Sequence, residues 1–194
     1  MVYDTSHGTV RCLLAWAPHA DAAWRWVAGN ESSSTSEIIG LGPRGAFDSH
    51  ICFAAASPSA WGGSERLYYF GGNGPHSGER NSSLGVATLR KDGYAGVRGA
   101  GHVELAPVLC TADRLLVTWD ASGPTSALRI GLAHPEESDA GLALNRSVPL
   151  ERSVTDAPVA FSGGCDFRAL RGRNVTLAVE LRGDGGTLYT VGFG

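Results

Sequence analysis

The chain has almost no lysine and no block of basic residues. Lys91 is its single lysine, the formal net charge is −3, and the arginines are spread through 194 residues. A nucleic-acid-binding surface needs basic side chains gathered in a patch or stripe. The sequence therefore argues against a nucleic acid partner.

Long apolar runs are also missing. No run approaches the roughly 20 residues that cross a bilayer, so we expect no membrane span. The first residues, Met1 to Asp4, carry no basic group, and the apolar run from Cys12 to Ala17 is too short for the core of a signal peptide. If the protein is secreted, we expect this chain to be part of a longer precursor whose signal lies elsewhere.

Convincing helical periodicity with capping residues is absent as well. Short runs of branched and aromatic residues alternate with turn residues, and 27 glycines and 9 prolines are distributed along the chain. This pattern is typical of short β-strands joined by many turns. The sequence predicts an all-β protein.

Motifs for metals and cofactors do not occur. The six histidines lack the His-X-His and His-X3-His spacings, and the four cysteines contain no C-x-x-C pair. The glycine-rich segment 71–78 lacks the Lys-Ser/Thr of a phosphate-binding loop, and no nucleophilic triad is recognisable. We predict neither a cofactor nor a metal site.

Two features favour an extracellular or cell-surface location. The first is a set of four Asn-X-Ser/Thr glycosylation sequons, where about one is expected by chance in a chain of this length. The predicted glycosylation sites are Asn30, Asn81, Asn145 and Asn174.

The second feature is an even number of cysteines: Cys12, Cys52, Cys110 and Cys165. Four cysteines allow three pairings. Because two lie in each half of the chain, we favour disulfides Cys12–Cys52 and Cys110–Cys165. The alternative is four buried free thiols, since unpaired cysteine behaves as a small apolar residue.

The chain divides into two regions of different character. Residues 1–98 read as antiparallel hairpins with polar loops, whereas residues 99–194 contain about eight more regular strands. The second region suggests a two-sheet β-sandwich with a jelly-roll-like strand order. The segment Gly183 to Gly186 predicts a hairpin turn between the last two strands.

A candidate ligand site centres on the loop that follows Leu67 to Phe70. Polar side chains on a loop between two stiff strands commonly present a site. The planar guanidinium of Arg80 offers several donors to a sugar hydroxyl or an acidic group. Trp61 and Tyr69 would stack on a sugar ring. The predicted ligand-binding residues are Asp48, His50, Trp61, His76 and Arg80.

Structural roles compete with this interpretation. Asp48 would cap a turn, and His76 would hold its hairpin in place through hydrogen bonds. Catalysis by a glycosidase needs two carboxyl groups about 5–9 Å apart. Asp48 is a weak candidate, with Glu65 or Glu79 as its partner, but no spacing in the sequence forces such a pair together.

Three motifs in the first region resemble a known group of proteins. They are GAFDSH (45–50), YYFGGNGPH (68–76) and NSSLGVATLRKDGYAGV (81–97), and they precede the strand-rich second region. In this order they resemble the C-terminal part of glycosidase-like proteins with a five-bladed β-propeller, of the invertase, levanase and arabinanase type. The segments 113–132 and 161–193 are similar to the sandwich that follows the propeller in that group.

The resemblance implies an incomplete propeller in residues 1–98 and a jelly-roll-like sandwich in residues 99–194. A full propeller needs roughly 250–300 residues, and the first region would supply about two blades at most. The family's central carboxylates would then lie outside this chain, so we expect the chain alone to be inactive.

Three functions follow as expectations. The first is an extracellular, N-glycosylated module that binds carbohydrate without catalysis or forms a structural part of a cell-surface assembly. Its partner would be carbohydrate or a larger glycoprotein assembly, including the N-terminal part of the same precursor. The second is the C-terminal portion of a secreted glycoside hydrolase, whose propeller is completed by another chain or by upstream sequence. The third is an adhesion module with a protein partner.

Overall fold

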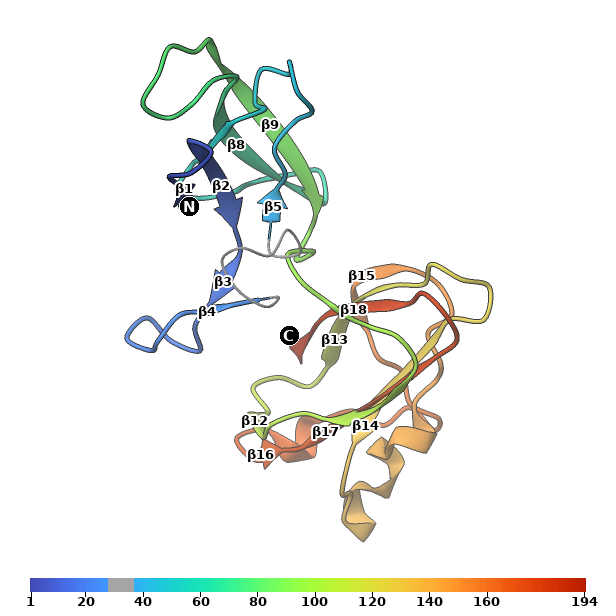
Figure 1. The fold of residues 1–194 in the computed structure, drawn as a ribbon. Helices are drawn as coiled ribbons and strands as arrows, with labels where there is room; N and C mark the ends of the chain where they lie inside the picture. Colours follow the sequence, from blue (N-terminus) through green and yellow to red (C-terminus); the bar gives the residue numbers. More distant parts are fainter. Residues whose placement is uncertain (28–36) are drawn as a thin grey trace. The chain divides into compact units, whose positions relative to one another are not determined.

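The computed structural model describes residues 1–27 and 37–194 and divides into two compact units (Figure 1). The N-terminal unit spans Met1–Tyr94 and the C-terminal unit spans Ala95–Gly194. The chain is all-β, with several antiparallel sheets and a few short 3-10 turns. No sheet among the described residues closes on itself. The predicted glycosylation site Asn30 lies outside the described residues.

The N-terminal unit contains one seven-stranded sheet and one two-stranded ribbon. The central path of the sheet runs β1-β2-β6-β8-β7, with β5 paired to β2 and β9 paired to β8, and the ribbon is β3-β4. The bounds are β1 (Val2–Asp4), β2 (Thr9–Leu13), β3 (Ala15–Trp16), β4 (Arg25–Trp26), β5 (Glu37–Ile39), β6 (Ile51–Ala54), β7 (Ser59–Trp61), β8 (Ser64–Gly72) and β9 (Ser82–Arg90).

The β8–β9 ladder is the backbone of this unit. Its nine consecutive antiparallel pairs run from Ser64↔Arg90 to Gly72↔Ser82. The strands β6 and β7 pair with successive stretches of the other edge of β8, so residues 51–90 form an up-and-down meander. A two-residue turn at Gly62 and Gly63, both with positive φ, joins β7 to β8.

The core of the N-terminal unit is small. Cys12, Ile39, Cys52 and Tyr69 form its buried cluster, and a few half-buried apolar side chains pack around them. Cys12 and Cys52 form a disulfide with a Cα–Cα distance of 5.8 Å, which confirms the first predicted pairing. The disulfide joins β2 to β6 at the centre of the sheet.

The C-terminal unit contains a four-stranded sheet of order β10-β18-β13-β15, a three-stranded sheet of order β11-β17-β14 and the pair β12-β16. The bounds are β10 (Val97–Arg98), β11 (Gly101–Glu104), β12 (Val108–Leu109), β13 (Leu115–Asp120), β14 (Ala127–Leu132), β15 (Val154–Pro158), β16 (Asn174–Val175), β17 (Leu177–Arg182) and β18 (Thr187–Phe193). Three 3-10 segments are described in this unit: η2 (Glu137–Leu142), η3 (Leu144–Arg146) and η4 (Arg168–Leu170).

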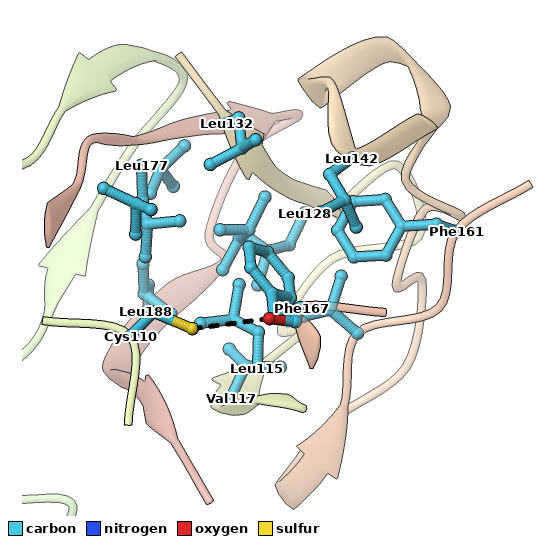
Figure 2. Packing of buried hydrophobic residues seen from close by; sticks show 14 of the residues in the cluster. Cys110, Leu115, Val117, Leu128, Leu132, Leu142, Phe161, Phe167, Leu177 and Leu188 are labelled. Carbon is cyan, nitrogen blue, oxygen red and sulfur yellow. Dashed lines mark hydrogen bonds between the residues drawn. The ribbon is translucent and has the colours of Figure 1, made fainter. Parts of the chain in front are cut away.

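The two larger sheets of this unit share one extensive hydrophobic core. Side chains of β13 and β18 in one sheet and of β14 and β17 in the other belong to the same buried cluster. Figure 2 shows Phe167 and Phe161 within it, with the two rings edge to face at 5.7 Å between centroids. Trp119 is fully buried and lies against Gly186, where a Cβ would meet the indole. The core thus ties the two sheets into two layers.

The structure differs from three expectations about this region. The second predicted disulfide does not form, because Cys110 is fully buried in the core whereas Cys165 is an exposed free thiol. The Cys110 Sγ donates instead to the backbone oxygen of Phe167 (Figure 2). The turn at 183–186 connects β17 to β18, but these strands belong to different sheets and do not form a hairpin. The predicted first region also ended after Arg98, whereas β10 pairs with β18 inside the C-terminal unit.

Candidate functional site

The predicted ligand loop at 71–81 is braced by its own polar groups. The Arg80 guanidinium donates to the backbone oxygens of Pro75, at 3.2 Å, and His76, at 2.6 Å. Asn73 and Asn81 close the loop, since the N–H of each is bonded to the other residue's carbonyl or amide oxygen. These contacts direct Arg80 toward the loop backbone. The sequence suggested that Arg80 contacts a ligand, and the structure shows that its guanidinium holds the loop.

His76 lies against two aromatic rings of the same unit. Its ring centroid is 4.9 Å from that of Tyr3 and 5.8 Å from that of Phe53, both in edge-on geometry. Its backbone N–H donates to the carbonyl of Gly8 at 2.8 Å. His76 therefore ties the loop to β1, β6 and the β1–β2 turn, while the residue stays exposed to solvent.

Asp48 is buried beneath this loop. It is only 8 % exposed, and its Oδ2 accepts a hydrogen bond of 2.7 Å from the hydroxyl of Tyr69. Gly42 and Gly71 pack so closely that a Cβ on either would overlap Asp48. Burial, reinforced by the bond to Asp48, raises the pKa of Tyr69 to about 12. Tyr69 is part of the core and is not available to stack on a sugar, which corrects that prediction.

His50 belongs to the same end of the sheet. Its Nδ1 lies 2.9 Å from the hydroxyl of Ser49, and its backbone N–H donates to Gly72. Its carbonyl accepts from Val10, so the backbone of His50 extends the sheet between β2 and β8. The side chain is half-buried. Four of the five predicted ligand residues thus lie close to the Gly72 end of β8.

Trp61 stands apart from these four residues. It pairs with Ser64 at the opposite end of β8. Gly72 lies eight positions after Ser64, which is about 26 Å of strand. The structure therefore does not gather the five predicted residues into one site.

A different group of side chains accompanies Trp61. Directly paired residues of antiparallel strands share a face of the sheet, and side chains alternate along a strand. The pairs Trp61↔Ser64, Tyr68↔Val86 and Phe70↔Leu84 therefore place these apolar residues on one face. We call it the aromatic face; its exposed members are Trp61 (62 %), Tyr68 (46 %), Phe70 (40 %), Leu84 (78 %) and Val86 (52 %).

One charged group is fixed beside the largest ring of this face. The guanidinium carbon of Arg66 lies 4.3 Å from the centroid of the Trp61 ring. Arg66 pairs with Ser59 on β7, which lies two residues before Trp61 on the same face. The cation–π contact orients both side chains and leaves Trp61 largely exposed.

A pocket opens at the turn that ends the aromatic face. Its volume is about 340 Å³, and its lining includes Pro58, Trp61, Gly62, Glu65 and Lys91. Glu65 is occupied within the protein, because its carboxylate accepts from the backbone N–H of Asp92 and from the hydroxyl of Tyr94. The rest of the lining combines apolar surface with the single lysine of the chain.

The aromatic face could be only partly expected from the sequence. The run Leu67 to Phe70 is apolar at every position, so alternation alone does not say which face is buried. The structure buries Tyr69 with the disulfide and leaves Tyr68 and Phe70 in solvent. The sequence pattern that could have indicated this face is on β9, where the large apolar residues Leu84 and Val86 alternate with the small residues Gly85 and Ala87.

The C-terminal unit has a pocket of its own. It is about 430 Å³ in volume and is lined by Arg129, Leu144, Asn145, Glu180 and Arg182, among others. Its charges are engaged internally: Arg182 pairs with Glu180 at 2.9 Å, and Arg129 donates to the carbonyl of Ser147. This pocket lacks exposed aromatic rings and is the weaker ligand site.

Metal and membrane sites do not emerge from the described residues. Within residues 1–27 and 37–194, no three His, Cys, Asp or Glu side chains form a group that could hold a metal ion. No helix in this part of the chain is long and apolar enough to cross a bilayer.

Comparison with known proteins gives no assignment: no protein-family model, no curated protein and no solved structure matches the chain.

Proposed function

We propose that this chain is an extracellular, N-glycosylated module that binds carbohydrate without hydrolysing it, and that the aromatic face is its binding surface. One observation carries the proposal: Trp61, Tyr68 and Phe70 expose their rings on the same face of one sheet. Aromatic side chains combine a large apolar surface with defined geometry and suit flat, partly apolar ligands such as sugar rings.

The spacing of these rings suits an extended ligand. A strand rises about 3.3 Å per residue, so Tyr68 and Phe70 lie about 7 Å apart and Trp61, beside Ser64, lies about 13 Å before Tyr68. The row is therefore roughly 20 Å long. Exposed apolar side chains that gather on one face mark interaction sites in soluble proteins. A chain of several sugars matches this length better than a single sugar.

The candidate carboxylates support binding rather than hydrolysis. A glycosidase needs one protonated and one ionised carboxyl group open to the substrate. Asp48 is buried and accepts from Tyr69, and Glu65 accepts from Tyr94 and from the backbone of Asp92. The alternative of a hydrolase completed by upstream sequence or by another chain has no comparable observation in its favour.

The proposal includes the finer architecture suggested by the family resemblance. The meander of residues 51–90 supports a propeller-type blade, and the two layers of the C-terminal unit support a jelly-roll-like sandwich. The parallel pairing of Val10 with Ile51 departs from an up-and-down blade. In this proposal a larger glycoprotein assembly, including upstream parts of the same precursor, would adjoin the N-terminal unit.

Surface exposure supports the glycosylation sites. Asn81, Asn145 and Asn174 are all exposed. Intact mass of the protein from a eukaryotic secretory host, before and after enzymatic removal of N-glycans, tests this part directly. A single unmodified mass that does not change on treatment would contradict the proposed N-glycosylation.

Carbohydrate binding is tested with the full chain against insoluble and soluble polysaccharides, measured by depletion and by calorimetry. We expect Trp61→Ala to weaken binding about tenfold, as for loss of one stacking residue worth about 1.4 kcal/mol. Trp16→Ala is the matched control, because Trp16 is an exposed tryptophan on β3 outside the aromatic face. Equal losses in the two variants, or no binding to any polysaccharide, would contradict the proposal.

A further inference from the structure

The aromatic face has an uneven charge. The strands β7, β8 and β9 place two arginines and no carboxylate on it. The side chains on this face come from Ser59, Trp61, Ser64, Arg66, Tyr68, Phe70, Ser82, Leu84, Val86, Thr88 and Arg90. The chain as a whole carries a net charge of −3, so the positive charge of this face is opposite in sign to the net charge of the chain. A local positive field attracts anionic ligands.

The acidic residue next to Arg66 along β8 lies on the opposite face of the sheet, although it lines the pocket beside Trp61. Glu65 alternates with Ser64 and Arg66, so it lies on the opposite face, paired with Leu89. Its carboxylate accepts hydrogen bonds from two neutral donors of the protein, the Tyr94 hydroxyl and the Asp92 N–H. Within the described residues Arg66 has no acidic partner and contacts Trp61 instead.

The positions of the cations match those of the rings. Arg66 is held directly over Trp61, and Lys91 lines the pocket at the same end of the face. A guanidinium presents a planar fork of donors that fits a carboxylate or a sulfate. A sugar that stacks beside Trp61 would therefore meet a fixed positive charge at the edge of its ring.

We propose that the aromatic face selects anionic polysaccharide, with sugar rings on Trp61 and Tyr68 and a carboxylate or sulfate of the glycan paired with Arg66. This inference rests on the proposed carbohydrate binding and adds the class of ligand. The charge complementarity of the face and the fixed Arg66 guanidinium carry it.

Matched polysaccharide pairs test the proposal with the full chain. Polygalacturonate is compared with its methyl ester, and dextran sulfate with dextran, by affinity electrophoresis and calorimetry. We expect at least one charged polymer to bind about tenfold more tightly than its neutral partner, and the difference to shrink as NaCl rises. The two pairs separate a carboxylate ligand from a sulfate ligand.

Substitutions identify the residue responsible. Arg66→Gln keeps hydrogen-bonding capacity but removes the charge, so we expect it to abolish most of the preference and retain weak binding of the neutral polymers. Arg66→Lys keeps the charge and should retain part of the preference. Arg25→Gln is the control, because Arg25 is an exposed arginine on β4, outside the aromatic face.

The outcomes separate this inference from the proposed function. Binding of charged and neutral polymers with equal affinity, or equal losses in Arg66→Gln and Arg25→Gln, overturns the preference for anionic glycans and leaves carbohydrate binding in place. No binding to any of the four polymers overturns both.

Discussion

The two units are stabilised in different ways. The C-terminal unit buries seventeen apolar residues in one cluster among the described residues and keeps both of its cysteines as free thiols. The N-terminal unit has a buried cluster of four, two of which are the cysteines of its disulfide. A unit that buries little needs a covalent cross-link, and the apolar side chains that it leaves outside are free to serve as a binding surface.

The largest effect should come from breaking the core of the C-terminal unit. Trp119 is fully buried between its sheets, so Trp119→Ala should reduce the free energy of unfolding of that unit by about 3–5 kcal/mol. Urea titration with hydrogen exchange read on peptides from β13 and β17 measures it. Trp16→Ala, which removes an exposed ring, is the control. A loss below about 1 kcal/mol would show that the shared core is not the source of stability.

The disulfide provides the matching test in the N-terminal unit. The double substitution Cys12→Ser with Cys52→Ser should cost about 2–4 kcal/mol, because it frees a loop with a sequence separation of 40 residues. Hydrogen exchange should rise in β6, β8 and β9 and stay unchanged in β13 and β17. Cys165→Ser, at an exposed free thiol, should change neither unit. Equal hydrogen-exchange protection of β8 with and without the disulfide would show that the N-terminal unit does not depend on its cross-link.

Two adjacent tyrosines sharpen the contrast between the faces of the N-terminal sheet. Tyr69→Phe removes the buried bond to Asp48 and should cost about 1–3 kcal/mol of unfolding free energy. Tyr68→Phe removes the hydroxyl of a neighbouring exposed ring and should cost almost nothing. Chemical denaturation of both variants measures the difference. Similar costs at the two positions would mean that burial does not distinguish the faces.

Alkaline pH should also act on the N-terminal unit. Burial raises the pKa of Tyr69 and of Tyr94 from 10.0 to about 12, with hydrogen bonds to Asp48 and Glu65 adding to it. Between pH 10 and 12 the unfolded chain loses these protons while the folded chain keeps them, so stability falls as pH rises.

The stability that the protonated Tyr69 and Tyr94 contribute is fully present below pH 10 and is lost as the pH passes about 12. Unfolding free energies measured from pH 9 to 12 check this sign. The variant Tyr69→Phe with Tyr94→Phe should show a shallower fall, and an unchanged slope would point to other groups.

The comparison also shows where sequence reasoning succeeded and failed for the cysteines. Cys12 and Cys52 were paired because both lie in the first half of the chain, and the structure confirms this pair. The same argument failed for Cys110 and Cys165, since position along the chain carries no information about burial. Cys110 sits inside the large core, where a small apolar thiol fits without a partner.

The candidate site was located only in part. Predicted strand ends and loop polarity drew attention to Asp48, His76 and Arg80, and all three hold the loop or the core of the N-terminal unit. Trp61 was identified, but its companions Tyr68 and Phe70 were not. Their exposure depends on which face of β8 meets the disulfide cluster, and the uniformly apolar run around them gives no local clue.

The sequence by itself determined the all-β class, because alternation and turn residues act locally. Only the tertiary structure decided which face of β8 is buried, which cysteines meet, and that β17 and β18 enter different sheets. These choices depend on packing between residues far apart in the chain, and a local pattern contains no information about such partners.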